Sequence, residues 1–174
     1  MNLTTRKIVI SGMLGAISII LGATGIGLIP VPTPAGHATI MHVPTIIGGV
    51  LEGPVVGFFI GLIFGIFSFI RATNPIFADP LIAVVPRLFI GVGAYYIYYL
   101  LKKYNVSFAL ILAGVIGTVI NTGLVLGLAV LRGYLPFEAA ASVAFLHGIP
   151  EAILAAVIVV IVGKAILSMK TQQG

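Results

Sequence analysis

The 174-residue sequence contains no cysteine and no tryptophan, and only 7% of its residues are charged. The absence of cysteine excludes disulfide bridges and thiolate metal sites. Soluble domains carry roughly 25% charged residues, so this chain has too few charges to cover a water-facing surface. Instead, 60% of its residues are hydrophobic and its mean hydropathy is +1.24. These values predict an integral membrane protein.

Motifs for nucleotide hydrolysis and for common hydrolases are also absent. The one Gly-Lys pair, Gly163-Lys164, lacks the upstream glycine spacing of a P-loop, so the chain itself is not expected to hydrolyse ATP. Neither HExxH nor GxSxG occurs, and a hydrolytic arrangement of Ser68, His147 and Glu151 has no nucleophile motif to support it. The three histidines and four acidic residues are too dispersed for a metal site. We therefore expect no metal and no cofactor in this chain.

Hydrophobic segments follow one another at about residues 7–29, 39–51, 55–70, 80–101, 107–131 and 143–168. About 20 apolar residues are needed to cross about 30 Å of hydrocarbon. The first segment reaches that length, so it is expected to be a retained helix rather than a signal peptide. The second is short and resembles a tight helical hairpin with the third, turning at Gly53-Pro54. The predicted fold class is an all-α integral membrane protein of six transmembrane helices, forming one domain over residues 1–174.

The distribution of Lys and Arg predicts the orientation, because cytoplasmic loops carry an excess of both. Six basic residues fall on the side of the two chain ends: Arg6, Lys7, Lys102, Lys103, Lys164 and Lys170. The opposite loops carry only Arg71 and Arg132. Both termini are therefore predicted to be cytoplasmic. The first outer connection, IPVPTPAGHATIMHVP (29–44), is rich in proline, which gives an ordered, non-helical loop suited to a lid.

Small residues form two patterns along the helices. A GxxxGxxxG ladder runs from Gly57 to Gly65, and such ladders let helix backbones approach closely in lipid. We expect this ladder to pack inside the bundle. Gly12, Gly15 and Ala16 form a small-residue stripe near the cytoplasmic end of the first segment. That stripe either packs internally or docks another membrane subunit.

Polar and ionisable side chains at membrane depth are costly and mark functional sites by default. The candidates are His42, Arg87, Asn121, His147 and Glu151. His147 and Glu151 are four residues apart, so they share a helix face if Pro150 leaves the helix continuous. Because all five fall in the outer half or near the middle of the bilayer, they predict a capture site that opens outward. His37 and Asn74, on the outer connections, complete the predicted substrate-binding set.

Structural roles remain open for these residues. The side chain of Arg87 is long enough to reach the outer headgroups, and Asn121 can hydrogen-bond between helices. His147 and Glu151 can pair with each other or with Arg87. His37 and His42 are either contacts on the lid side of the pocket or solvated loop histidines.

Taken together, these stretches resemble the substrate-binding S components of energy-coupling factor (ECF) vitamin transporters. The resemblance covers nearly the whole chain and rests on SGMLGA, ATIMHVPTIIGGVLEGPVVGFFIGLIFGIFSFI, DPLIAVVPRLFIGVGAYY, GTVINTGLVLG and HGIPEAILAAVIV. In many members the first-helix motif is Ala-x-x-x-Ala. Here Gly12 replaces the first alanine, which keeps the position small.

The resemblance implies a six-helix protein in the cell membrane of a prokaryote, with a tight vitamin-binding pocket that faces outward beneath the first outer loop. It also implies partners, namely a transmembrane coupling subunit and two ATPase subunits that use ATP. The S component would topple in the membrane to release the vitamin inside. The face formed by Gly12 and Ala16 would dock the coupling subunit.

The residues favour a small anionic vitamin as the substrate. Large flat rings favour aromatic stacking partners, but tryptophan is absent and the tyrosines cluster mainly on the inner side. Arg87 suits a carboxylate, while Asn121, His147 and Glu151 suit hydroxyl and amide groups. The chain most resembles the pantothenate-type subgroup, within a pantothenate/riboflavin-like set, and we predict pantothenate. Riboflavin, folate, a queuosine precursor and cobalamin remain alternatives, as do a stand-alone facilitator and an intramembrane enzyme.

Overall fold

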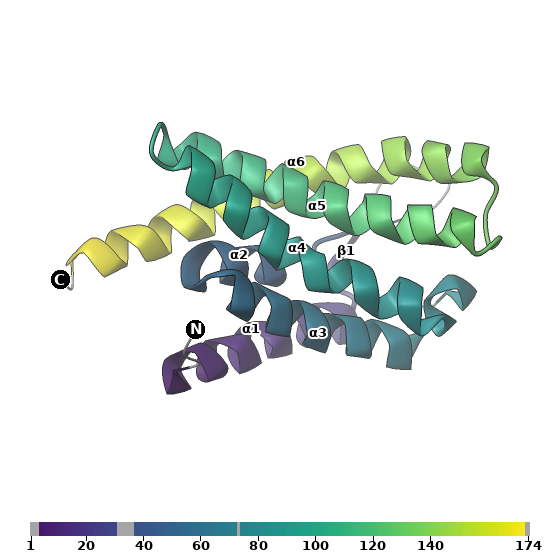
Figure 1. Ribbon diagram of the computed structural model, residues 1–174, viewed down its shortest axis with the longest axis horizontal. Helices are drawn as coiled ribbons and strands as arrows, with labels where there is room; N and C mark the ends of the chain where they lie inside the picture. The colour runs from purple at the N-terminus through teal and green to yellow at the C-terminus, as the bar shows by residue number, and fades with distance from the viewer. Residues whose placement is uncertain (1–3, 31–36, 73, 173–174) are drawn as a thin grey trace.

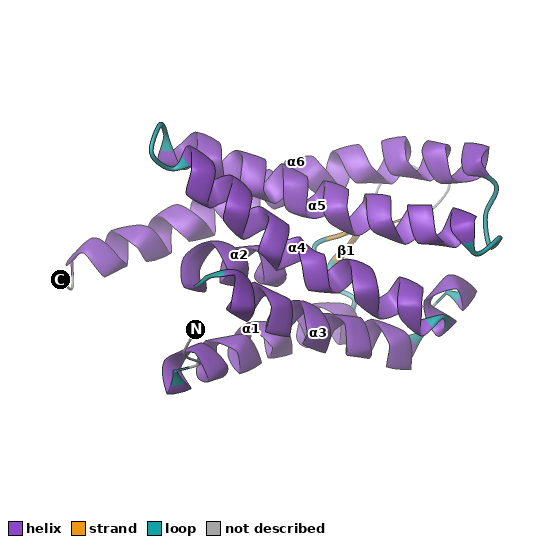
Figure 2. Cartoon of the chain, in the orientation of Figure 1, coloured by secondary structure: helices purple, strands orange, loops and turns teal. Residues whose placement is uncertain are grey.

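The computed structural model describes residues 4–30, 37–72 and 74–172. Its helices are α1 (Thr5–Thr24), α2 (Val43–Glu52), α3 (Pro54–Arg71), α4 (Pro80–Leu101), α5 (Val106–Leu131) and α6 (Phe137–Gln172). A short 3-10 helix, η1 (Pro75–Ala78), precedes α4. Strands β1 (Leu28–Pro30) and β2 (His37–Thr39) pair antiparallel. Figure 2 shows this hairpin as the one strand element beside a helical bundle in the described part of the chain.

Five of the helices are long and apolar enough to cross a membrane, namely α1, α3, α4, α5 and α6. The exception is α2, which has 10 residues and therefore rises about 15 Å. It cannot cross about 30 Å of hydrocarbon by itself. The all-helical membrane architecture with six helices agrees with the sequence prediction. Of the six predicted transmembrane helices, five are candidate spans, and the exception is α2, the segment whose sequence is short.

Helix boundaries differ from the prediction at both ends of α6, which starts at Phe137 rather than near residue 143 and ends at Gln172 rather than near residue 168. They differ also around the first outer connection. α1 ends at Thr24 rather than near residue 29, because Gly25 adopts φ 77°, a left-handed conformation that favours glycine at helix ends. Leu28–Pro30 then pairs with His37–Thr39, which delays the start of α2. Residues 31–36 of the proline-rich loop lie outside the described residues, so the proposed ordering of this lid stays a prediction.

The short helix α2 lies at the centre of the bundle. It packs against each of the five other helices, and all eight residues from 43 to 50 are buried. Figure 1 shows α3, α4, α5 and α6 following one another as neighbours, with α1 beside α3. Both chain ends lie at the left of that view, at the same end as the turn between α4 and α5.

The glycine ladder of α3 packs against α4, as predicted. A Cβ atom added at Gly57 would lie 2.8 Å from Cα of Gly91, and one added at Gly61 would collide with the carbonyl oxygen of Arg87. The two backbones are therefore in direct contact. This contact fixes the depth of Arg87 relative to α3.

Candidate functional site

A cavity of about 460 Å³ lies between the β1–β2 hairpin and the helices. Its lining includes nine polar residues: Thr39, Ser68, Arg71, Asn74, Arg87, Asn121, Thr122, His147 and Glu151. The fold thus brings together five of the seven predicted substrate-binding residues, from η1, α4, α5 and α6. Their contact with a substrate stays a prediction.

Arg87 is held in a defined orientation at this cavity. Its side chain is buried, with only 4% of the residue exposed, and Nη1 donates a hydrogen bond of 2.6 Å to the carbonyl oxygen of Ile82. The guanidinium carbon lies 4.8 Å from the ring centre of Phe77 and 5.5 Å from that of Phe64. Arg87 therefore does not extend to the headgroups, which was the structural alternative for this residue.

The charge of Arg87 has no carboxylate partner among the described residues. The two ion pairs of that part of the chain join Arg6 to Glu52 and Arg132 to Asp79. Nε of Arg87 is also buried without a hydrogen-bond partner there. A buried cation is costly unless it is paired, so this position is chemically suited to an anionic group.

Glu151 connects the hairpin to two helices. Its Oε1 accepts a hydrogen bond of 2.8 Å from the backbone amide of Thr39 in β2. Its Oε2 lies 3.4 Å from the hydroxyl of Thr122, which donates to it. α6 continues through Pro150, so the predicted shared face with His147 exists. Glu151 therefore combines a place in the cavity wall with a contact that holds one side of the hairpin.

Asn121 and His147 lie on facing helices, α5 and α6, and both are buried. Oδ1 of Asn121 has no hydrogen-bond partner within the described part of the chain. Asn121 also lines the cavity, and its side-chain amide offers both a donor and an acceptor group.

His42 is fully buried, with 0% of its surface exposed, and does not contribute to the cavity lining among the described residues. Its Nε2 lies 2.9 Å from Oγ1 of Thr118, whose hydroxyl donates to the carbonyl oxygen of Gly114. Because that hydroxyl proton is already engaged, Nε2 of His42 must be the donor. His42 thus anchors the start of α2 to α5. The backbone of His37 lies in β2, but its side chain lies outside the described part of the structure.

Four polar residues of the cavity wall were not predicted as substrate-binding from the sequence, namely Thr39, Ser68, Arg71 and Thr122. Arg71 lines the cavity from the end of α3, with its guanidinium carbon 6.0 Å from the ring centre of Phe67. It had been interpreted solely as an orientation signal, although its place on the outer side could have suggested a role at the cavity. Thr39 contributes a backbone amide, which no residue-type pattern reveals.

The small residues of α1 divide between two faces. Gly12 and Ala16 are exposed, and a Cβ atom added at Gly12 would meet nothing within 4 Å. Gly15 is buried, and a Cβ atom there would lie 2.7 Å from Cδ1 of Ile63 in α3. Gly15 therefore packs inside the bundle, which does not favour its place in the predicted docking group, and docking by Gly12 and Ala16 stays a prediction. Gly12 and Ala16 remain on a surface that a partner can reach.

A search of the described residues for metal sites found no group of three or more His, Asp or Glu side chains that could hold an ion.

Residues 6–163 match the family model described as ECF transporter, substrate-specific component. Over 108 residues the chain is 32% identical to the pantothenic acid transporter PanT of Lactococcus lactis subsp. cremoris (strain MG1363). That alignment covers 51% of this chain and 54% of the relative, so it spans about half the length of the curated protein. The fold is also similar to a solved structure of the S component of a bacterial ECF transporter, with a TM-score of 0.58 and coverage of 96% of both chains. At 20% identity, this last similarity concerns the fold alone.

Proposed function

Because the chain belongs to the family of ECF transporter substrate-specific (S) components, we propose that it captures pantothenate at the outer face of a bacterial cell membrane. S components bind a substrate and associate with the ECF module, so the chain is a transporter subunit rather than an enzyme. In this proposal a transmembrane coupling subunit and two ATPase subunits join it, and those ATPases use the ATP. The vitamin is then released on the cytoplasmic side.

The observation that carries the choice of substrate is the buried guanidinium of Arg87, which has no carboxylate partner among the described residues. Pantothenate has a carboxylate at one end, an amide in the middle and hydroxyl groups at the other end. A carboxylate would pair with Arg87 by charge-assisted hydrogen bonds. Asn121 and Glu151 can serve the amide and hydroxyl groups. The partial similarity to a pantothenic acid transporter supports the same choice.

The size and lining of the cavity also suit a small vitamin. Its volume of about 460 Å³ falls within the roughly 300–1,000 Å³ of small-molecule pockets. The aromatic residues in its lining are Phe64, Phe67 and Phe77, and two of them flank the guanidinium of Arg87. This leaves little aromatic surface for stacking a large ring such as that of riboflavin, folate or cobalamin.

Thermal unfolding of the purified chain with a vitamin panel tests the proposal. A ligand that binds only the folded state stabilises it by about 2.7 kcal/mol at 100 times Kd, so pantothenate should raise Tm strongly. The alcohol analogue, in which the carboxylate is replaced by a hydroxymethyl group, should raise Tm much less. In Arg87→Ala the two compounds should become equivalent, because the group that distinguishes them has lost its partner. A larger shift with riboflavin, folate, a queuosine precursor or cobalamin would overturn the choice of pantothenate.

A further inference from the structure

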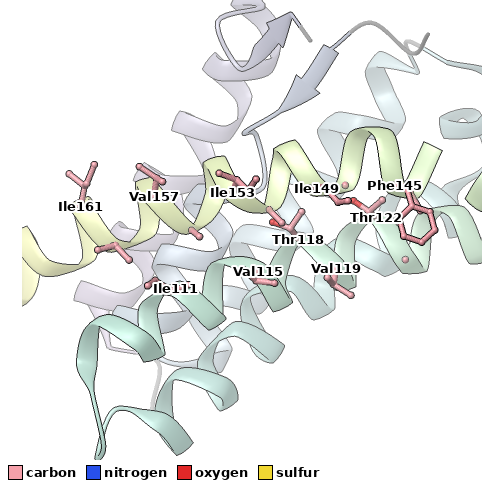
Figure 3. Close-up of a pocket in the computed structure, with 16 residues that line it drawn as sticks. Ile111, Val115, Thr118, Val119, Thr122, Phe145, Ile149, Ile153, Val157 and Ile161 are labelled. Atoms are coloured by element: carbon pink, nitrogen blue, oxygen red, sulfur yellow. The ribbon is translucent and has the colours of Figure 1, made fainter. Parts of the chain in front are cut away.

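A second hollow, which borders the candidate cavity at Thr122, lies along α5 and α6 on the surface of the bundle. It has a volume of about 800 Å³, and Figure 3 shows rows of apolar side chains following both helices along it. The labelled side chains are Ile111, Val115, Thr118, Val119 and Thr122 from α5, and Phe145, Ile149, Ile153, Val157 and Ile161 from α6. We call this hollow the α5–α6 groove.

The floor of the α5–α6 groove is open because small residues leave space there. A Cβ atom added at Gly123 would meet nothing within 4 Å, and one at Gly148 would meet only Cγ2 of Thr122, at 3.7 Å. Gly114 differs, since a Cβ atom there would lie 2.8 Å from Cα of Ala156. Gly114 is thus needed for helix contact, whereas Gly123 and Gly148 border unfilled space.

The dimensions of the groove match those of the hydrocarbon layer. The stretch from Phe145 to Ile161 rises about 24 Å at 1.5 Å per residue, which is most of the roughly 30 Å thickness of the bilayer core. Phe145, Ile153 and Ile161 are all more than half exposed. In a membrane, these walls face acyl chains.

Positive charge is concentrated beyond one end of the groove. Lys164 lies three residues after Ile161 on α6, while Lys102 and Lys103 lie in the turn that precedes α5, the helix that carries Ile111. All three lysines are exposed. By the positive-inside rule, this end faces the cytoplasmic leaflet, where anionic headgroups attract basic residues.

We propose that the α5–α6 groove binds an acyl chain of an anionic phospholipid of the inner leaflet, with the headgroup at the end of the groove beyond which Lys102, Lys103 and Lys164 lie. The apolar walls suit hydrocarbon, and the lysines complement the phosphate charge. A transmembrane helix is a poorer occupant, because close helix packing in lipid requires the partner backbone to reach the small residues of the floor. Here the rims carry Ile and Val side chains, which hold a second backbone away.

Native mass spectrometry of the full purified chain, equilibrated with equal amounts of phosphatidylglycerol and phosphatidylcholine, tests the proposal. The wild-type chain should retain phosphatidylglycerol in preference. Replacing Lys102, Lys103 and Lys164 together with Gln should reduce that preference on the order of a hundredfold, since each lysine near an anionic surface contributes about fivefold.

A pair of matched glycine variants tests whether the acyl chain of the lipid lies in the α5–α6 groove. Gly123→Leu fills the groove and should weaken retention of both lipids about tenfold, equivalent to about two excluded methylene groups. Gly127→Leu is the control, because Gly127 is exposed one turn further along α5, has nothing within 4 Å of an added Cβ, and does not line the groove. It should leave retention unchanged. If Gly123→Leu does not fold by circular dichroism, Gly148→Leu blocks the groove from α6 instead.

Three results would overturn the proposal. One is equal retention of both lipids by the wild-type chain. The second is identical behaviour of the folded groove-filling variant and Gly127→Leu. The third is the dissociation of a protein oligomer by the groove-filling variant, which would make the groove a protein interface.

Discussion

Arg87 is oriented before any ligand arrives. Two phenyl rings flank its guanidinium, and the carbonyl oxygen of Ile82 holds Nη1. Nε lacks a hydrogen-bond partner among the described residues, so the guanidinium retains unused donor capacity. A planar fork can bind a carboxylate through two parallel hydrogen bonds, whereas an ammonium group acts as a point charge.

Arg87→Lys should therefore weaken pantothenate binding about tenfold to a hundredfold, the range for losing one hydrogen bond to a charged group. The charge is kept, so the loss should be smaller than in Arg87→Ala. Isothermal titration of the three chains checks the order. Equal affinities for the Lys and Ala variants would mean that the fork geometry has no role.

Glu151 should control how long a ligand stays in the cavity, because its Oε1 binds the amide of Thr39 in the hairpin. Glu151→Ala removes this bond, and we expect ligand dissociation to be about tenfold faster, or more. Glu151→Gln keeps a carbonyl acceptor and should fall between the Ala variant and the wild type. Stopped-flow displacement measures the rates. Thr122→Val removes the 3.4 Å contact to Glu151 but leaves the hairpin bond of Glu151 intact, so it should change the rate less than Glu151→Ala.

The position of α3 against α4 depends on glycines that allow direct backbone contact, rather than on interlocking side chains. In Gly61→Ala the added methyl group would collide with the backbone of Arg87, and overpacking of this kind costs about 1–3 kcal/mol. Tm should fall and pantothenate affinity should fall with it, since α4 must shift. Gly127→Ala, at an open position of α5, should be neutral or slightly stabilising because alanine favours helix. If both alanine variants melt like the wild type, the backbone contact between α3 and α4 is not tight.

Substitutions on the two faces of α1 should distinguish a role in assembly with the partner subunits from a role in stability. Gly12→Trp places a bulky ring on the exposed face, so it should block association with the coupling subunit while leaving pantothenate binding intact. Gly15→Trp directs the same ring into Ile63 and should lower Tm. Co-purification with the ECF module and a melting curve for each variant check both outcomes. Loss of binding in the Gly12 variant would assign that face to internal packing.

For the molecule as a whole, the predicted orientation can be tested directly because the chain has no cysteine. Lys103→Cys lies in the turn between α4 and α5, and Gly133→Cys lies in the opposite turn between α5 and α6. With both termini cytoplasmic, a membrane-impermeant maleimide should label the cysteine at 133 in intact cells and label the one at 103 only after lysis. The reverse pattern would invert the topology.

Much of the fold could be predicted because composition and span length are strong signals in membrane proteins. The bounds of α4 agree with the prediction, since Asp79 caps its first turn and Pro80 occupies the first helical position. The late start of α2 could not be predicted, because it depends on pairing between Leu28–Pro30 and His37–Thr39 across a proline-rich loop. Local patterns do not report such contacts.

The candidate site could likewise be predicted in part from the sequence. Burial of polar groups in a membrane is costly, so residue type alone indicated Arg87, Asn121, His147 and Glu151. The same rule indicated His42, but its anchoring role depends on Thr118, 76 positions away in the chain. Which face Gly12 and Gly15 occupy likewise depends on where α3 lies.

The direct contact between α3 and α4 also bears on how this cavity can diverge over evolutionary time. The depth of the Arg87 backbone is set by its main-chain contact with Gly61, so it does not depend on the side chains that complete the wall. Phe67 and Val143 line the cavity and can then mutate one at a time, each reshaping the cavity while the backbone of Arg87 stays in place. Single-residue changes in the wall can thus alter the shape of the cavity without disturbing the contact between α3 and α4.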